Sequence, residues 1–250
     1  MSARAYILCT APRSGSTMLC GMLAATGVTG APQSFFHRPD PTSWARGLDL
    51  PEGATLDQIL RAVRATATDG LTGIRLQQHS FAFLMNALAE YGASDPARIA
   101  AAFGPTRYVW LRRQDTVAQA ISLLRAEQTG LWHRNADGSA REELDPTRDD
   151  GYDAQIITDQ IAAFDVANRA WRDWFAAHRI TPHSLTYEAL VADPQTSLAG
   201  VLRYLGIASK RSEDIAQRTS VPTKKLADAT SDTWSARYHA DVLAKRSESP

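Results

Sequence analysis

The segment from Tyr6 to Leu23 constrains the fold more than any other part of the sequence, and it reads Y-I-L-C-T-A-P-R-S-G-S-T-M-L-C-G-M-L. Its first five residues are mostly apolar strand formers, and the next five include proline, serine and glycine, which favour a turn. From Ser16 onwards, apolar residues recur at helical spacing. A strand, a tight loop and a helix are therefore expected within 18 residues, and this pattern predicts an α/β protein.

The loop that ends at Gly15 has the composition of an anion-binding site. The amide groups at the start of a helix point towards the preceding loop, and the helix dipole adds positive potential there. Arg13 contributes a full charge, and Ser14, Ser16 and Thr17 contribute hydroxyl groups. A plain strand-to-helix turn with a helix N-cap is the simpler alternative, but such a turn rarely needs an arginine and three hydroxyl groups together. We therefore predict that the loop binds a phosphate group.

The loop stands where many nucleotide-binding proteins carry the Walker A motif, G-x-x-x-x-G-K-[ST]. When the motif is aligned on Gly15 and Thr17, this sequence has Thr10 in place of the first glycine and Ser16 in place of the lysine. The lysine of the motif reaches the terminal phosphates, so its absence argues against ATP or GTP. A phosphotransferase with a P-loop is the alternative function, and it is disfavoured for this reason.

The composition excludes several classes of protein. The chain has 250 residues, of which 44% are hydrophobic and 22% are charged, so we expect one globular domain over residues 1–250. The 27 basic and 27 acidic residues balance, which gives no general electrostatic reason to bind nucleic acid. No apolar segment reaches the roughly 18 residues of a membrane span, and the first five residues do not resemble a signal peptide. We expect a soluble, cytoplasmic protein in which Cys9 and Cys20 are small buried residues.

Two long segments without a clear helical or strand pattern, at about 28–54 and 129–151, are predicted to be functional loops. The first contains an aromatic and polar mixture suited to the wall of a binding site: Gln33, Ser34, Phe35, Phe36 and His37. A surface loop anchored by its two phenylalanines is the alternative. The second segment is polar and is a candidate lid or partner contact.

A second concentration of positive charge follows the apolar segment Y-V-W-L at 108–111. Arg112 and Arg113 stand at the end of this predicted strand, and Asp115 is the predicted N-cap of a helix that carries Ser122. Ligands of α/β proteins bind at the carboxyl ends of the strands. The two arginines therefore predict a second anion site, with an exposed basic turn or an ion pair to Asp115 as the alternative.

A phosphate loop without lysine and a distant pair of arginines suit a ligand with two separated anionic groups. The stretch A-P-R-S-G-S-T resembles the 5′-phosphosulfate loop of sulfotransferases that use 3′-phosphoadenosine 5′-phosphosulfate (PAPS). The stretch L-R-R-Q-D-T-V-A-Q-A-I-S is similar to their 3′-phosphate motif. Over nearly its whole length the chain resembles the bacterial trehalose 2-sulfotransferase family, through T-G-V-T-G-A-P-Q-S-F-F, R-A-E-Q-T-G-L-W-H-R, L-T-Y-E-A-L and S-D-T-W-S-A-R-Y.

This resemblance implies a P-loop-type sulfotransferase fold with a central, mainly parallel sheet flanked by helices. It implies an enzyme that transfers a sulfuryl group from PAPS, without a metal, to a hydroxyl group of a carbohydrate or glycolipid-type acceptor. The residues expected to bind PAPS are Arg13, Ser14, Gly15, Ser16 and Thr17 at the phosphosulfate end and Arg112, Arg113 and Ser122 at the 3′-phosphate. Arg13 is also expected to stabilise the leaving phosphate, and Lys224 or Lys225 to close over PAPS. The resemblance further implies a homodimer, and the long aromatic helix expected over about 152–178 would permit one.

The sequence departs from the trehalose family at the residue expected to act as the base. The P-Q-x-F-F segment of that family carries a glutamate as the proposed base, whereas this chain has Ser34 there and Ala31 in place of a preceding glutamate. Serine is a poor base near neutral pH, so we predict that His37 takes the role, with His79 and Glu127 as alternatives. Residues expected to contact the acceptor are Gln33, Ser34 and Phe35. The loss of the glutamate also leaves open a protein that binds PAPS without turnover.

Overall fold

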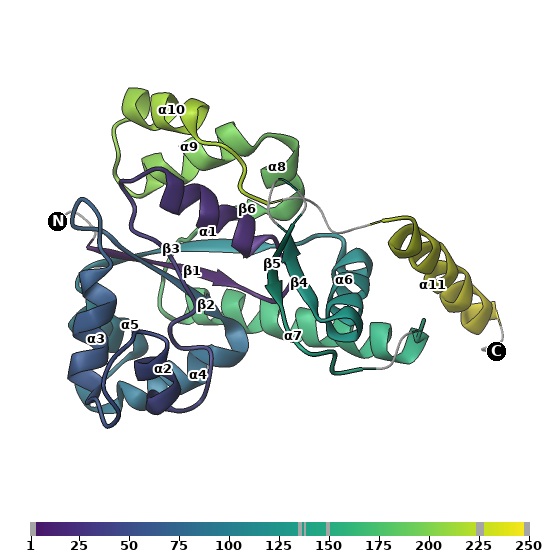
Figure 1. Cartoon of the computed structure of the whole chain (residues 1–250), viewed down its shortest axis with the longest axis horizontal. Coiled ribbons are helices and arrows are strands. Elements are labelled where there is room, and N and C mark those ends of the chain that lie inside the picture. Colours follow the sequence, from purple (N-terminus) through teal and green to yellow (C-terminus); the bar gives the residue numbers. More distant parts are fainter. Residues whose placement is uncertain (1–3, 135–136, 138, 149–150, 224–227, 248–250) are drawn as a thin grey trace. The chain divides into compact units, whose positions relative to one another are not determined.

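The computed structural model of the chain describes residues 4–134, 137, 139–148, 151–223 and 228–247. It shows a parallel sheet flanked by helices, which confirms the predicted α/β fold class (Figure 1). The chain divides into two compact units, one made of Met1–Arg112 and Ala167–Val221 and the other of Arg113–Val166 and Pro222–Pro250. The expectation of a single domain over residues 1–250 stays a prediction.

The first unit contains a four-stranded sheet with the strand order β2-β1-β3-β6. Its strands are β1 (Ala5–Thr10), β2 (Thr72–Gln77), β3 (Thr106–Arg112) and β6 (His183–Thr186). All three pairings are parallel, and Cys9 stands between Leu76 and Trp110 in the register. The carboxyl ends of the four strands therefore lie at one edge of the sheet, as the sequence predicted.

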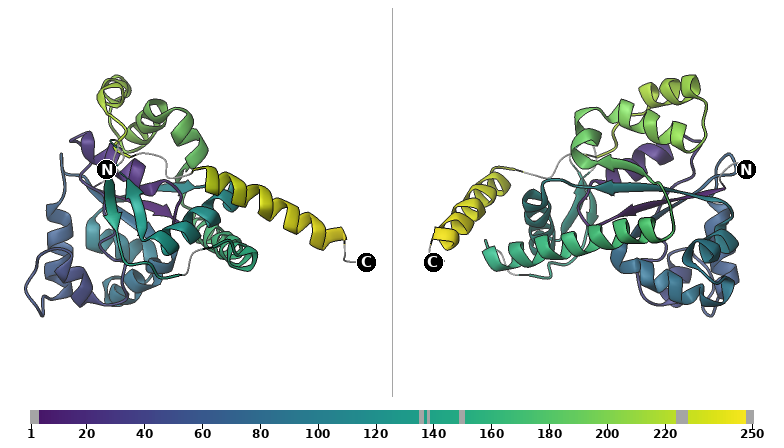
Figure 2. Two further views of the ribbon diagram at one scale, coloured as in Figure 1. Left: turned by 45° about the vertical axis from the view of Figure 1, so that its right-hand side comes forward. Right: turned by 180° about the vertical axis from the view of Figure 1, so that it is seen from behind.

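Helices cover both faces of this sheet because the side chains of β1 alternate between two apolar clusters (Figures 1 and 2). Tyr6 and Leu8 pack with α1 (Ser16–Ala25) and α9 (Pro194–Tyr204). Ile7 and Cys9 belong to the other cluster, to which further helices contribute: α3 (Leu56–Ala65), α4 (Gln78–Ala87), α5 (Asp95–Phe103) and the end of α7 (Ala154–Ala177). Cys9 and Cys20 are both buried free thiols, as expected.

The segment expected to be a long loop at about 28–54 contains a helix, α2 (Pro41–Arg46), which corrects that prediction. The carboxylate of Asp40 accepts a hydrogen bond from the backbone N–H of Ser43 at 2.8 Å, and Pro41 occupies the first helical position. Trp44 is buried, with its ring centroid 5.0 Å from that of Phe36. This packing fixes the short helix on the core.

The remaining elements of the first unit are a short 3₁₀ helix, η1 (Ala89–Tyr91), and the helices α8 (Tyr187–Ala192) and α10 (Ser209–Arg218). In α7, Trp171 and Phe175 are buried in the core of the sheet, so these aromatic residues have a structural role of their own. Homodimer formation stays a prediction from the resemblance. Within the described part of the chain, every helix is too short or too polar to span a membrane.

The second unit consists of α6 (Thr116–Thr129), the strands β4 (Leu131–Arg134) and β5 (Ala140–Glu143), the first part of α7, and α11 (Ala229–Ser247). β4 and β5 pair antiparallel within the segment expected to be a loop at about 129–151, which corrects that prediction too. Gly130 permits this arrangement because its φ is 69° and a Cβ there would lie 1.8 Å from the carbonyl oxygen of Leu144.

Polar side chains hold α11 against the rest of the second unit. The hydroxyl of Tyr152 donates to the Asp241 carboxylate at 2.6 Å, and the guanidinium of Arg237 lies 4.1 Å from the centroid of the Tyr152 ring. Arg125 of α6 forms an ion pair with Asp228, just before α11 begins. Residues of the S-D-T-W-S-A-R-Y stretch take part in this packing, since the ring centroids of Trp234 and Tyr152 are 6.0 Å apart and the hydroxyl groups of Tyr238 and Thr158 are 3.0 Å apart.

Candidate functional site

The loop between β1 and α1 has the geometry of an anion site. Gly15 is the N-cap of α1 in the left-handed conformation, with φ 85° and ψ 10°. The backbone N–H of Leu19 donates to the carbonyl of Gly15 at 3.2 Å, and this bond begins the hydrogen-bond ladder of the helix. The amide groups of the first turn consequently face the loop, at the positive end of the helix dipole.

Buried hydrogen bonds stabilise the loop between β1 and α1. The hydroxyl groups of Thr10 and Ser14 are hydrogen-bonded to each other, and both residues are 0% exposed. The indole N–H of Trp171 donates to the carbonyl of Thr10 at 3.1 Å, where the strand passes into the loop. The Ser14 hydroxyl, expected to contact PAPS, is thus engaged within the loop, which leaves its backbone N–H as the group that would face a ligand.

Arg13 adopts a conformation that non-glycine residues rarely use. Its φ is 60°, and its side chain is half-buried. An L-residue in the left-handed region costs about 1–2 kcal/mol, and such strain concentrates at functional sites. Asp49, Asp69 and Arg179 also have a positive φ, so the binding role of Arg13 stays a prediction.

Tyr187 packs closely against the loop at Gly15. It follows Thr186 at the carboxyl end of β6, where the Thr186 hydroxyl accepts from the backbone N–H of Ala189 at 3.2 Å and caps α8. A Cβ at Gly15 would lie 2.5 Å from Cδ2 of the Tyr187 ring. The L-T-Y-E-A-L stretch and the loop are therefore packed against each other.

Arg75 of β2 is a candidate site residue that the sequence analysis missed. Its Nη1 donates to the Thr17 hydroxyl at 2.9 Å, and its Nε donates to the Ser34 hydroxyl at 2.7 Å. Its backbone N–H donates to the carbonyl of Gln33 at 3.0 Å, beside a parallel bridge between Gln33 and Ile74. Arg75 thus joins the first turn of α1 to the segment expected to bind the acceptor.

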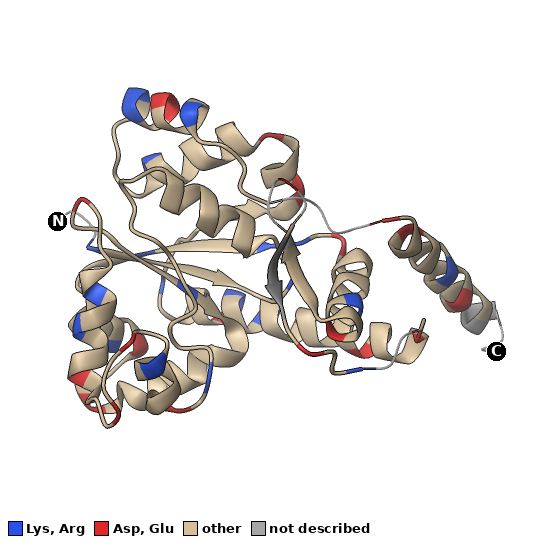
Figure 3. Ribbon diagram, in the orientation of Figure 1, with Lys and Arg blue, Asp and Glu red and all other residues tan. Residues whose placement is uncertain are grey.

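The charged residues of the four strands provide a sequence signal that could have identified Arg75. Its four strands carry three arginines and no acidic residue, and Figure 3 shows how few charges the strands hold. Arg107 bonds the carbonyl of Tyr204 and lies over that ring, so its role is structural. Arg112 lies 4.9 Å from the centroid of the Trp110 ring and pairs with Thr186 in the register, at the carboxyl edge where the sequence predicted it.

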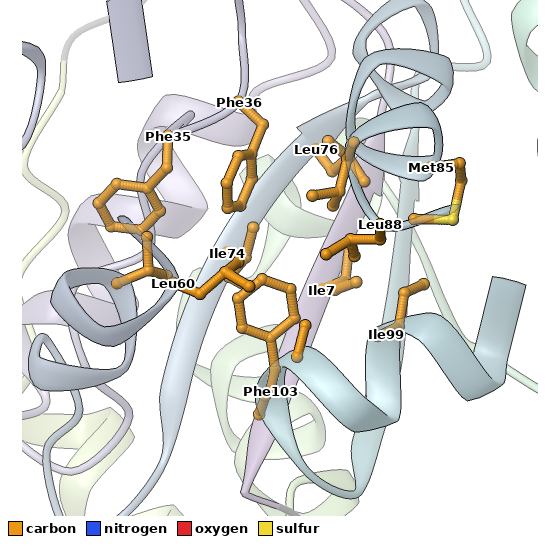
Figure 4. Close-up of a cluster of buried hydrophobic side chains, with 14 of the residues drawn as sticks. Ile7, Phe35, Phe36, Leu60, Ile74, Leu76, Met85, Leu88, Ile99 and Phe103 are labelled. Carbon is orange, nitrogen blue, oxygen red and sulfur yellow. The ribbon is translucent and has the colours of Figure 1, made fainter. Parts of the chain in front are cut away.

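The acceptor segment divides into exposed and buried residues. Gln33 is exposed and Ser34 is half-buried. Phe35 is only 9% exposed and belongs, with Phe36, to the cluster that contains Leu60 and Ile74 (Figure 4). This burial favours the alternative in which the two phenylalanines anchor the loop, and an acceptor role for Phe35 stays a prediction.

His37 is exposed and forms a pair with His79, with ring centroids 5.2 Å apart. The Ser80 hydroxyl donates to the carbonyl of His37 at 3.3 Å and holds the segment in place. Partial burial and the nearby His37 lower the pKa of His79 below its ordinary value of 6.5. His79 therefore favours its neutral form.

Other predicted site residues lie in the second unit or outside the described residues. Arg113 and Ser122 belong to the second unit, in which the Asp115 carboxylate accepts from the backbone N–H of Ala118 at 2.8 Å and caps α6, as predicted. Glu127, the reserve base, forms an ion pair with Arg148 at 2.5 Å, which opposes that role. Lys224 and Lys225 lie outside the described residues.

Comparison with known proteins gives matches along nearly the whole chain. The family model described as Stf0 sulphotransferase matches residues 5–241. A trehalose 2-sulfotransferase of Mycobacterium tuberculosis (strain Erdman) is 28% identical over 271 residues, with 96% of each chain covered. A trehalose 2-sulfotransferase of Mycolicibacterium smegmatis is 28% identical over 278 residues, with 95% of each covered. A solved sulfotransferase domain of the Synechococcus PCC 7002 olefin synthase has a TM-score of 0.44 at 15% identity, with 94% of each chain covered.

Proposed function

Because this chain belongs to the Stf0 sulphotransferase family and is a sulfotransferase, we propose that it transfers a sulfuryl group from PAPS to a hydroxyl group of a carbohydrate acceptor. The observation that carries this proposal is the position of Arg75, which joins Thr17 of the anion-binding helix start to Ser34 of the acceptor segment. The names of the two mycobacterial relatives support a sugar, or a glycolipid with a sugar headgroup, as the acceptor class.

The residues of the loop suit the phosphosulfate end of PAPS. Arg13 and the amide groups at the start of α1 supply positive charge, and the buried Thr10 and Ser14 pair keeps the loop in place. Ser16 stands where a triphosphate-binding loop has its lysine, which suits a ligand with less charge than a triphosphate. Arg112, Arg113 and Ser122 are the residues proposed to hold the 3′-phosphate.

Transfer of a sulfuryl group requires in-line geometry and stabilisation of the leaving phosphate, by analogy with phosphoryl transfer. PAPS supplies the activated sulfuryl group, and the residues of this chain hold it in line with the acceptor. Arg13 and the first-turn amides of α1 stabilise the negative charge that develops on the departing phosphate oxygen. Gln33 and Ser34 orient the acceptor hydroxyl from the opposite side.

A base must take the proton of the acceptor hydroxyl, and His37 is the residue that we assign to this step. The Ser34 hydroxyl accepts a hydrogen bond from Arg75, and a hydroxyl beside a guanidinium is a weak proton acceptor. His37 stands on the same segment, and imidazole has an ordinary pKa near 6.5, which suits a base at neutral pH.

Thermal stabilisation by ligands tests the proposed function and separates it from a phosphotransferase. Adenosine 3′,5′-bisphosphate should raise the Tm of the protein in the presence of a metal chelator. Stabilisation by Mg·ATP but not by the bisphosphate would instead support phosphoryl transfer. Stabilisation by the bisphosphate without a sulfated product from any sugar would support a PAPS-binding protein without turnover, the alternative that Ser34 motivates.

A further inference from the structure

Arg75 connects two parts of the site that are distant in the sequence. Its partner Ser34 is 41 positions away and its partner Thr17 is 58 positions away. Thr17 belongs to the helix start that is proposed to bind the donor, and Ser34 belongs to the segment that is proposed to bind the acceptor. The guanidinium therefore stands where the two substrates would meet.

Among the described residues, Arg75 has no carboxylate partner for its positive charge, whereas several other arginines of this protein do. Arg98, Arg125 and Arg148 form ion pairs with Asp95, Asp228 and Glu127. Arg75 is half-buried, and within the described residues it bonds two hydroxyl groups but no carboxylate. It also lies beside the positive end of α1, so two sources of positive potential face each other. An anion bound between them would remove this unfavourable interaction.

The guanidinium of Arg75 also has N–H groups left to donate to such an anion. A guanidinium has five N–H groups, and the bonds to Thr17 and Ser34 account for two of them. The remaining groups lie in the same plane and match the oxygen atoms of an anion well.

We propose that Arg75 is a catalytic residue that binds the oxygen atoms of the sulfuryl group as it passes from donor to acceptor. This inference rests on the proposed function. In the step, the acceptor oxygen forms a bond to sulfur while the bond between sulfur and the 5′-phosphate oxygen breaks. The electron pair of the broken bond stays on the phosphate, near Arg13, and the proton of the acceptor passes to the base. Arg75 stabilises the group between these two oxygens.

The variant Arg75→Gln tests this role because it removes the charge but keeps a polar side chain. Loss of a preorganised donor to the transferring group should lower kcat by about 10² or more. Stabilisation by adenosine 3′,5′-bisphosphate should stay near the wild-type level, because this ligand has no sulfuryl group. Arg13→Gly, which tolerates the φ of 60° at this position, should differ from Arg75→Gln by weakening the stabilisation by the bisphosphate as well as lowering kcat, because Arg13 is proposed to contact the phosphate itself.

Two controls separate direct contact from a role in positioning. If Arg75 acts only by holding Ser34, the variant Ser34→Ala should lose as much kcat as Arg75→Gln, and the double variant should lose no more. Arg64→Gln is the matched control, since Arg64 donates to the carbonyl of Ala102 at 2.5 Å and has no proposed part in the reaction. We expect wild-type kcat from Arg64→Gln and a smaller loss from Ser34→Ala than from Arg75→Gln.

The outcomes distinguish the inference from the function on which it rests. Wild-type protein that forms no sulfated product contradicts the proposed function. Active wild-type protein overturns the inference if Arg75→Gln keeps its kcat, if Ser34→Ala reproduces the loss, or if the bisphosphate no longer stabilises Arg75→Gln. If Arg75→Gln does not fold, Arg75→Lys serves in its place, with a lowered kcat and retained stabilisation by the bisphosphate as the expected result.

Discussion

Gly15 and Tyr187 are in contact so close that a Cβ at position 15 would lie 2.5 Å from Cδ2 of the tyrosine ring. The φ of Gly15 is 85°, so two independent constraints require glycine at this point of the loop. The loop, the start of α1 and the carboxyl end of β6 are thereby fixed to one another.

The variant Gly15→Ala should consequently displace the loop. Overpacking typically costs about 1–3 kcal/mol, and the left-handed backbone adds further strain. We expect a lower Tm and weaker stabilisation by adenosine 3′,5′-bisphosphate in thermal-shift measurements. The second change Tyr187→Ala in the same chain should restore part of the loss by removing the clash, and an unaltered Gly15→Ala protein would contradict this contact.

Trp171 and Trp174 provide a matched pair on α7. The indole of Trp171 donates to the carbonyl of Thr10 at 3.1 Å, and that of Trp174 donates to the Asp95 carboxylate at 2.9 Å. Trp171→Phe should lower the free energy of unfolding by about 1–3 kcal/mol, because it removes the indole donor from a buried carbonyl. Trp174→Phe should cost less, because the Asp95 carboxylate keeps its ion pair with Arg98. Urea unfolding measures this loss.

Only Trp171→Phe should also weaken binding of the bisphosphate, because Thr10 leads directly into the loop. Titration calorimetry on both variants makes the comparison. Equal affinities for the two variants would show that the Trp171 bond does not support the site.

His183 should make the protein less stable in acid. Partial burial and the nearby Arg203 lower the pKa of His183 below its ordinary value of 6.5, and its ring also faces Tyr204. The unfolded chain therefore binds a proton at a pH where the folded chain does not, so the free energy of unfolding falls as the pH falls below about 6.5.

Urea unfolding between about pH 7.5 and about pH 5.5 measures this slope. The variant His183→Gln should show a shallower slope than the wild type. His79, whose pKa is also lowered, acts in the same direction and should account for part of the slope that remains. A slope in His183→Gln as steep as that of the wild type, or steeper, would contradict the assignment.

His37 is the proposed base, so His37→Ala should lower kcat by about 10²–10⁴, the contribution typical of a positioned acid or base. Stabilisation by the bisphosphate should not change, because the change affects the acceptor side. His79→Ala is the comparison, since its ring is the neighbour of His37 and its pKa is lowered. Unchanged turnover in His37→Ala would remove it from the mechanism.

Local sequence patterns predicted the parts of this fold that depend on neighbouring residues. The strand, loop and helix from Tyr6 to Leu23 follow from apolar spacing and turn residues, and the N-cap at Asp115 follows from its side chain. Asp40 and Pro41 carried an equally clear signal for α2, but the prolines around them suggested a structureless loop instead.

Contacts between distant residues could not be predicted in this way. Arg75 stands in an ordinary strand pattern, and its role emerges only when the chain brings it to Thr17 and Ser34. The burial of Phe35 likewise depends on α3 and β2, which lie later in the sequence. An arginine inside an otherwise uncharged strand was the sequence signal for Arg75, and it identifies a residue without identifying its partner.

The most direct test is incubation of the purified chain with PAPS and a panel of sugars that includes trehalose, followed by mass spectrometry. We predict a sulfated sugar and an equal amount of adenosine 3′,5′-bisphosphate, formed in the presence of a metal chelator. The absence of any sulfated sugar, with PAPS left intact, would contradict the proposed function.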